Sequence, residues 1–244
     1  MRRVLATLLV GLIVVAGASA APQTRTADRP IVLAASSLTE VLPRIEPDGR
    51  YSFAGSNQLA QQIRLGAPFD VFLSASPIYT QGLFGEGLVR KPVAFATNSL
   101  VVIVPRSNPR RIRTVYDLAR RPSLRLVVAG PNVPIGLYTR KVLKRLGLLR
   151  VLKKAVSLEP DVKGIVGKVA LGVADAGFVY RTDVRPVADK VRAIALPPRS
   201  QPTVRYEAAI AARPESLESA QSFVIDLLSA DGRRSLRDAG FGLP

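Results

Sequence analysis

Short apolar runs alternate along the chain with segments whose apolar positions recur at helical spacing. The runs predict strands at 31–35, 51–54, 69–73, 100–104, 124–129, 174–180, 191–196 and 204–211. Helical spacing predicts helices that start at Ser37, span 57–65, open at Pro77, follow Thr114, span 134–147 and 161–171, and close the chain after Pro214. Strands that alternate with helices through short connections indicate βαβ units, so we expect an α/β fold with mainly parallel sheets.

The number of elements exceeds what one compact α/β lobe usually needs, and it fits two lobes of roughly 100 residues each. Crossings of the chain near Thr97 and Pro197 would insert the second lobe into the first. We therefore expect one lobe from residues 28–97 plus 197–244 and the other from residues 98–196, with a single large lobe as the alternative.

The N-terminus has the pattern of a secretory signal peptide. Two arginines precede an apolar run at 4–17, and Ala18-Ser19-Ala20 matches an A-x-A cleavage site. The run is short for a membrane span, so an uncleaved anchor is the alternative. We predict a signal peptide at residues 1–20, cleavage near Ala20 and a periplasmic protein. Because the sequence has no cysteine, we expect neither a lipid anchor on an N-terminal cysteine nor a disulfide.

Composition excludes several kinds of chemistry. The chain contains no histidine, which removes the Ser-His-Asp triad and the usual zinc sites. The acidic residues are scattered, and neither a G-x-S-x-G motif nor a phosphate-binding Walker loop is present. We therefore predict that the protein is not an enzyme and that it needs no cofactor and no free metal cation.

The chain is strongly basic, with 35 lysines and arginines against 18 acidic residues. Most of the excess falls in two stretches, residues 106–125 and 140–154. Single-stranded nucleic acids are bound where basic and aromatic side chains interleave, and here aromatics make up 6% of the chain. We interpret the charge as a solvated face that speeds encounter with anions at low salt, and we expect no nucleic-acid partner.

Two strand-to-helix turns carry the most informative pattern. Ala34-Ala35-Ser36-Ser37-Leu38-Thr39 and Phe53-Ala54-Gly55-Ser56-Asn57 each end an apolar run in small residues and a serine. Such a turn aims a hydroxyl and free backbone N–H groups at one point, which suits a buried anion. The structural alternatives are a capping box of Ser37 with Glu40, whose carboxylate would compete for the Ser37 N–H, and a simple helix cap at Ser56.

Several further segments, taken in order, have the pattern of one known family. They are Gly66-Ala67-Pro68-Phe69-Asp70-Val71-Phe72-Leu73-Ser74-Ala75, Asn98-Ser99-Leu100-Val101, Val133-Pro134-Ile135-Gly136-Leu137-Tyr138, Asp161-Val162 and Gly177-Phe178-Val179-Tyr180. Together with the two serine turns, they resemble the periplasmic molybdate-binding proteins of ABC importers, which are type II solute-binding proteins. The resemblance covers essentially the whole mature chain. It implies a two-lobe periplasmic-binding-protein fold with the ligand in the cleft between the lobes.

The resemblance also implies a set of ligand-binding residues. Ser37 and Ser56 would each give a hydroxyl and a backbone N–H, and Tyr180 would give its hydroxyl. Ile135 and Val162 would each give a backbone N–H at a helix start. Isoleucine at 135 is bulkier than the family's usual alanine, which puts the pocket width in question.

The function implied is capture of molybdate, and of tungstate, by hinge closure, followed by delivery to the permease of an ABC importer by a monomeric carrier. Another tetrahedral oxyanion such as sulfate is the alternative ligand. Related tungstate binders add carboxylates, for which Asp161 is the candidate, although a helix cap is its structural interpretation. Ferric-binding relatives use adjacent tyrosines, a related deaminase needs a cysteine, and transcription regulators carry a helix-turn-helix; none of these features is present.

Overall fold

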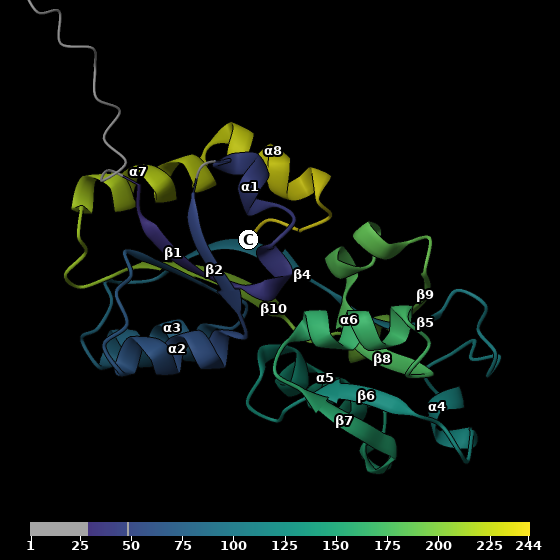
Figure 1. Cartoon of the computed structure of the whole chain (residues 1–244). Helices are drawn as coiled ribbons and strands as arrows, with labels where there is room; N and C mark the ends of the chain where they lie inside the picture. Colours follow the sequence, from purple (N-terminus) through teal and green to yellow (C-terminus); the bar gives the residue numbers. More distant parts are fainter. Residues whose placement is uncertain (1–28, 48) are drawn as a thin grey trace, which may run out of the picture.

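The computed structural model describes residues 29–47 and 49–244, so the predicted signal peptide at residues 1–20 lies outside the described residues. The chain forms two lobes side by side, each built on its own five-stranded sheet (Figure 1). The first sheet has the strand order β2-β1-β3-β10-β4. Its strands are β1 (Ile31–Ala35), β2 (Arg50–Ala54), β3 (Val71–Ser74), β4 (Val93–Asn98) and β10 (Val204–Ile210).

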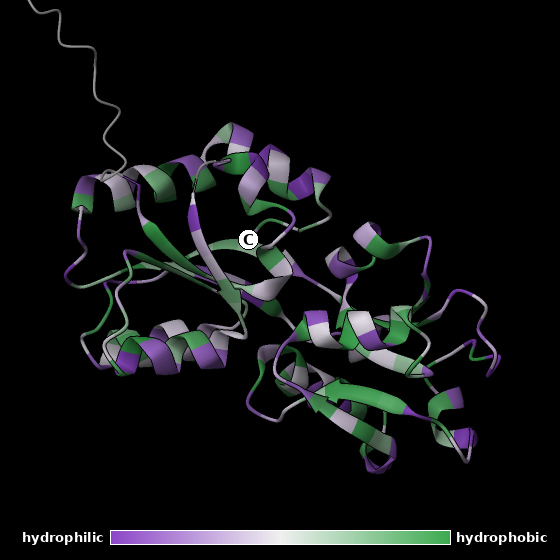
Figure 2. Ribbon diagram, in the orientation of Figure 1, coloured by the Kyte–Doolittle hydropathy of each residue, from purple (hydrophilic) through white to green (hydrophobic). Residues whose placement is uncertain are grey.

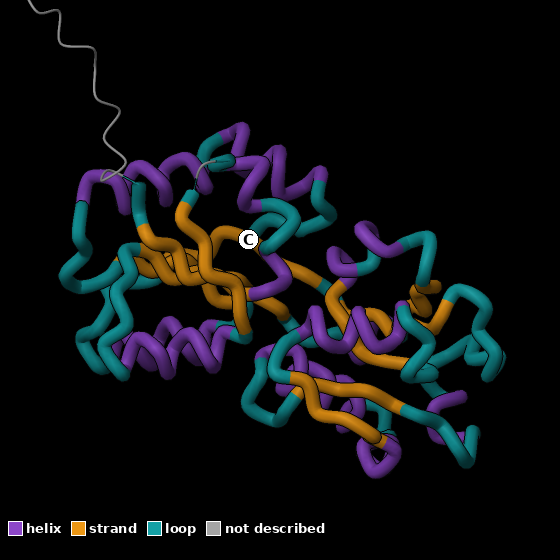
Figure 3. Tube along the Cα trace, viewed as in Figure 1, coloured by secondary structure: helices purple, strands orange, loops and turns teal. Residues whose placement is uncertain are grey.

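The second sheet has the order β7-β6-β8-β5-β9. Its strands are β5 (Leu100–Pro105), β6 (Leu126–Ala129), β7 (Ala155–Glu159), β8 (Ala176–Tyr180) and β9 (Val191–Ala195). The chain thus leaves the first sheet after β4 and returns to it at β10. The two sheets are clearly separate in the backbone trace (Figure 3). The lobe boundaries at residues 28–97 plus 197–244 and 98–196 stay a prediction.

Both sheets are mixed, where the sequence led us to expect mainly parallel pairing. Strands β1, β2 and β3 pair in parallel, but β10 runs antiparallel to β3 and β4. In the second sheet β5 runs antiparallel to β8 and β9, while β6 is parallel to its neighbours. The reason is connectivity: β5 and β10 are the strands on which the chain enters a lobe from the junction. They must lead away from the junction, whereas the remaining strands end toward it.

Helices pack on the sheets and leave the strand ends at the junction free. In the first lobe, α2 (Ser56–Arg64) and α3 (Pro77–Gly85) lie on one side of the sheet, and α1 (Leu42–Ile45), α7 (Leu217–Leu228) and α8 (Ala230–Asp238) lie on the other (Figure 1). The second lobe contains α4 (Asp117–Arg120), α5 (Pro134–Arg145) and α6 (Val162–Ala170). Strand β6 is hydrophobic along its length, whereas β2 is largely polar, and α2 carries polar and apolar residues side by side (Figure 2). In the described part of the chain, no helix has the length and apolar character to cross a membrane.

The prediction that an α-helix starts at Ser37 is wrong. The chain makes a 3₁₀ turn, η2 (Ser36–Leu38), and then begins α1 at Leu42. Pro43 explains the interruption, because its ring would clash with a carbonyl one turn earlier if the helix ran on from Ser37. The proline instead occupies the first turn of α1, where no N–H is needed.

Strands β4 and β7 were not predicted from the sequence. Both are edge strands of their sheets. In β7, Val156 and Leu158 are exposed, so the strand's apolar alternation points away from the core. The helix-ending glycines were identified correctly, because Gly66, Gly147 and Gly240 all adopt positive φ at a helix C-terminus.

Candidate functional site

A small cavity lies between the lobes, at the carboxyl ends of strands from both sheets. Its volume is about 10 Å³, far below the roughly 300–1,000 Å³ typical of pockets for drug-sized ligands. All five residues implied by the family resemblance line this cavity: Ser37, Ser56, Ile135, Val162 and Tyr180. The other lining residues are Ala35, Ser36, Ala54, Gly55, Ala75, Val133, Pro134 and Asp161.

Ser37 reaches the cavity from the turn that follows β1. It is buried, and its Oγ lies 2.9 Å from Tyr206 Oη. The first hydrogen bond within the turn runs from the Thr39 N–H to the Ser36 carbonyl. The Ser37 N–H comes earlier in the chain than this donor, so the turn itself offers it no acceptor. The capping-box alternative is wrong: no side chain caps this turn, and Glu40 instead pairs with Lys163 of the second lobe, 3.6 Å away. The Ser37 N–H therefore has no competing carboxylate.

Ser56 is the first residue of α2 and is almost fully buried. Its Oγ accepts a hydrogen bond of 3.1 Å from the Ala75 N–H. The simple-cap alternative is also wrong, because Gly55 is the N-cap, and Gln58 Oε1 accepts from the Gly55 N–H at 3.3 Å. The Ser56 hydroxyl proton and backbone N–H are therefore available to a ligand.

Ile135 and Val162 each occupy the first turn of a helix that starts at the cavity. Pro134 opens α5, and the first helical bond runs from the Leu137 N–H to the Val133 carbonyl, so the Ile135 N–H lies ahead of it. Val162 opens α6, whose N-cap Asp161 accepts from the Gly164 N–H at 3.0 Å. Asp161 is thus a helix cap. The helix starts add favourable potential for an anion.

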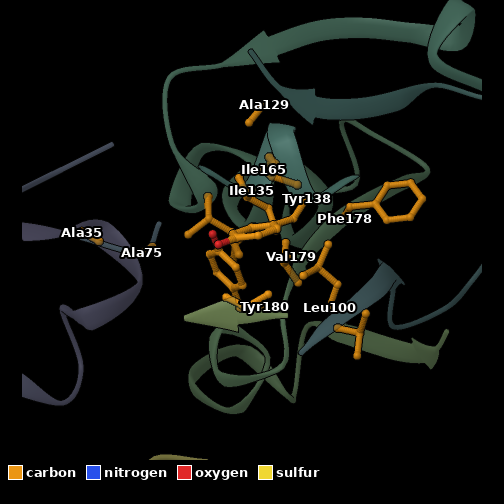
Figure 4. Packing of buried hydrophobic residues seen from close by; sticks show 14 of the residues in the cluster. Ala35, Ala75, Leu100, Ala129, Ile135, Tyr138, Ile165, Phe178, Val179 and Tyr180 are labelled. Atoms are coloured by element: carbon orange, nitrogen blue, oxygen red, sulfur yellow. The ribbon is translucent and has the colours of Figure 1, made fainter. Parts of the chain in front are cut away.

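Tyr180 ends β8 and is buried, with its ring edge-to-face against Tyr138 and Tyr206. Its Oη has no hydrogen-bond partner among the described residues. Figure 4 shows the Tyr138 and Tyr180 side chains extending from the second lobe toward the side where Ala35 and Ala75 lie. Burial raises the pKa of the Tyr180 phenol well above its ordinary value, so the group stays protonated and can donate. An unpartnered buried donor is costly and calls for an acceptor in the cavity.

Neutral groups alone line the cavity apart from the capping carboxylate of Asp161; the described lining includes no lysine or arginine. Lys163, next to Val162 in the chain, carries two ion pairs: its Nζ lies 3.6 Å from Glu40 Oε1 of the first lobe and 3.5 Å from Asp183 Oδ1 of its own lobe. Burial raises the pKa of the Asp183 carboxyl to about 6, although the Lys163 charge opposes this shift. Across residues 29–47 and 49–244, no cluster of three His, Cys, Asp or Glu side chains is placed to hold a metal ion.

The lobes meet closely around the cavity. A Cβ built on Gly55 of the first lobe would lie 2.5 Å from the Pro160 carbonyl oxygen of the second. The Tyr79 hydroxyl of α3 donates to the Asn132 carbonyl ahead of α5, and Arg185 donates to the Asp238 carbonyl at the end of α8. The structure therefore represents a state in which the lobes are closed on each other.

Tyr206 was missed by the sequence analysis. It lies on β10, is fully buried and contacts Ser37 of the first lobe and Tyr180 of the second. An inward-facing aromatic on an alternating strand looks like an ordinary core residue, so the sequence carried no signal for this role. Gly55 was noted only as part of the serine turn, since the carbonyl that restricts it comes from the other lobe.

Comparisons with known proteins identify the family of the chain. Residues 48–242 match the family described as bacterial extracellular solute-binding protein. The molybdate-binding protein ModA of Mycobacterium tuberculosis is 34% identical over 98% of each chain, and ModA of Escherichia coli is 34% identical over 73% of this chain and 76% of its own. The periplasmic molybdate-binding protein of Azotobacter vinelandii shares the fold, with a TM-score of 0.79 at 23% identity over 88% of this chain and 99% of that one. The chain therefore belongs to the bacterial extracellular solute-binding proteins, in the family of the molybdate-binding protein ModA.

Proposed function

We propose that this protein captures molybdate in the interlobe cavity and delivers it to an ABC importer. One observation carries the proposal: hydroxyl and N–H donors from both lobes line a single small cavity that no lysine or arginine enters among the described residues. The similarity to relatives named molybdate-binding protein ModA supports molybdate as the anion that these donors would hold. Ser37, Ser56, Ile135, Val162 and Tyr180 are the residues that would hold it.

The energetics of such a site are favourable. A hydrogen bond to a charged group contributes about 1.5–3 kcal/mol. The serines with their N–H groups, the two further amides and the phenol make about seven donors, or roughly 10–20 kcal/mol in total. Lost motional freedom offsets about 4–15 kcal/mol of that sum. Because the two ranges overlap, net binding requires that most of the seven donors reach the anion at the same time.

Charge and size determine which anion fits. Because the serine and tyrosine groups present protons and the amides can only donate, the site favours an anion with no proton of its own. Molybdate and tungstate are such dianions near neutral pH, whereas phosphate keeps a proton. The Asp161 carboxylate is the only charged acceptor in the described lining, and its Oδ1 already accepts from the Gly164 N–H as a helix cap. Sulfate is deprotonated but smaller, so it would leave some donors out of reach. We expect tungstate to bind as molybdate does, since the two anions are nearly equal in size.

The carrier role follows from where the donors lie. A ligand held by both lobes stabilises the closed state by its differential affinity, so capture should drive closure of a hinge between the lobes. The closed form is then the species that the permease recognises. In this role the protein is a monomeric periplasmic carrier, freed from its signal peptide near Ala20 without a lipid anchor. It neither catalyses a reaction nor binds nucleic acid.

Isothermal titration calorimetry of the purified chain with molybdate, tungstate, sulfate and phosphate tests the proposal. We expect one site per chain, similar dissociation constants for molybdate and tungstate, and binding at least 100-fold weaker for the other two anions, which is about 2.7 kcal/mol. A preference for sulfate, or no heat with molybdate, would overturn the assignment.

A further inference from the structure

Tyr206 lies where the two lobes meet, beside Asn98, the last residue before the chain passes into the second lobe. Its ring is fully buried and packs edge-to-face against Phe95, Tyr180 and Phe241. Its hydroxyl lies 2.9 Å from Ser37 Oγ and 3.4 Å from Asn98 Nδ2, at the end of β4. The hydroxyl is therefore placed between a ligand-binding serine and an amide that stands where the chain leaves the first lobe.

The direction of these hydrogen bonds follows from Asn98. Its Oδ1 accepts from the Ser99 N–H at 2.9 Å, which fixes the amide so that Nδ2 faces Tyr206 and Thr182. An amide nitrogen can only donate, so the Tyr206 oxygen is the acceptor of that bond. The single phenol proton then has Ser37 Oγ as its neighbour. Burial keeps the pKa of Tyr206 far above its ordinary value, so that proton stays on the phenol near neutral pH.

The consequence concerns the Ser37 hydroxyl. Since the Tyr206 oxygen already accepts from Asn98, we assign the phenol as the donor to Ser37 Oγ. The Ser37 hydroxyl proton must then point elsewhere, and the cavity is on the open side. Ser56 is arranged in the same way, since its oxygen accepts from the Ala75 N–H. Both serines are thus held with their oxygens turned to protein donors and their protons left for the ligand.

We propose that Tyr206 is a positioning residue that, oriented by Asn98, fixes the Ser37 hydroxyl as a donor and so excludes anions that carry a proton. This inference deepens the proposed function and rests on it. Without the phenol oxygen, Ser37 can rotate and accept a hydrogen bond from a bound anion. A singly protonated anion such as hydrogen phosphate would then find a hydroxyl acceptor in addition to Asp161, whose Oδ1 is already engaged in capping α6.

A double-mutant cycle tests whether Tyr206 acts through Ser37. Dissociation constants for molybdate and phosphate are measured for the wild type, Tyr206→Phe, Ser37→Ala and the double variant. We expect Tyr206→Phe to weaken molybdate binding about 3- to 10-fold, the size of one hydrogen bond. In the Ser37→Ala background the same change should have less than about a twofold effect. The ratio of phosphate to molybdate affinity should rise in Tyr206→Phe but not in the double variant.

Tyr51→Phe is the matched control. The Tyr51 hydroxyl donates to the Glu46 carbonyl at 2.8 Å within the same lobe and does not line the cavity. Asn98→Ala is the second variant. It removes the amide that donates to the Tyr206 oxygen and so directs the phenol proton toward Ser37, while leaving the Tyr206 side chain intact. It should lower selectivity against phosphate only where Ser37 is present. Thermal unfolding of every variant confirms that it is folded before titration.

Equal effects of Tyr206→Phe in both backgrounds would overturn the inference, because they would show that the phenol hydroxyl acts independently of Ser37. An unchanged phosphate-to-molybdate ratio would overturn it as well. Failure of the proposed function would look different: the wild type itself would prefer sulfate. The cycle measured with sulfate would then still decide the role of Tyr206.

Discussion

Gly55 lines the cavity but is not one of the five residues expected to hold the ligand, so a methyl group there can oppose closure of the lobes while every expected donor is kept. Its backbone has φ −62° and ψ 134°, a conformation that alanine adopts without strain. A Cβ at this position would meet the Pro160 carbonyl oxygen of the second lobe at 2.5 Å. Its other close neighbours, Asn57 Oδ1 and Gln58 Oε1, are side-chain atoms. Gly55→Ala should therefore be tolerated when the lobes are apart and should clash when they close.

The magnitude follows from the overlap. An ordinary contact begins at 3.4 Å, so the lobes must separate by about 1 Å at this point to admit the methyl group. Overpacking of this kind costs about 1–3 kcal/mol. If the whole cost falls on the closed state, molybdate affinity should drop roughly 5- to 150-fold. The free energy of unfolding of the ligand-free protein should change by less than about 1 kcal/mol.

Calorimetric titration with molybdate measures the affinity, and small-angle scattering with and without molybdate measures compaction. Gly85→Ala is the matched control, because a Cβ there meets nothing within 4 Å. We expect the control to bind as the wild type does and Gly55→Ala to compact less on binding. Native affinity and native compaction in Gly55→Ala would refute the idea that closure at this contact accompanies binding.

Three further expectations follow from the site. Because the Asp183 carboxyl has a pKa of about 6 when folded against an ordinary 3.8, the folded state holds its proton more tightly. The contribution of Asp183 to the free energy of unfolding should therefore fall by about 3 kcal/mol as pH rises from about 4 to 7, opposite in sign to the contributions of Glu159 and Asp175, whose pKa values are lowered. The difference between the wild type and Asp183→Asn in urea unfolding should change by about this amount over that range, and a pH-independent difference contradicts the burial argument. Tyr180→Phe should weaken molybdate binding about 10- to 100-fold by calorimetry, yet leave the free protein as stable or more so, since its Oη lacks a partner; a loss of stability would show that the hydroxyl has a structural role. The association rate for molybdate in stopped flow should fall with added salt because of the +17 formal charge, while the dissociation rate changes little; a salt-independent association rate would exclude steering.

The sequence predicted the interior strands well because their apolar runs are unbroken. Strand β1 was placed at the residues where it occurs, and β8 differs only at its start. Edge position alone does not explain the two missed strands, because β2 and β9 are edge strands too and were predicted. In the missed strands the apolar pattern does not follow burial. Strand β7 places Val156 and Leu158 in solvent, and β4 begins with an exposed Val93. The interruption after Ser37 required weighing Pro43, whose effect overrides the helical spacing around it.

The candidate site shows the same division. The serine turns carried a local signal, and the family resemblance added Ile135, Val162 and Tyr180, whose own residue types say nothing about a ligand. Tyr206 and the restriction on Gly55 could not be predicted, because each depends on atoms brought close only by the folded lobes. Contacts of this kind are set by the crossing topology, which no single stretch of sequence encodes.

The most direct measurement is a crystal structure of the protein grown with molybdate, with the metal located by its anomalous scattering. We expect one strong peak in the interlobe cavity, with the hydroxyls of Ser37, Ser56 and Tyr180 and the N–H groups of Ile135 and Val162 within hydrogen-bond distance of its oxygens. A peak outside this cavity, or an arginine or lysine in direct contact with the anion, would contradict the account.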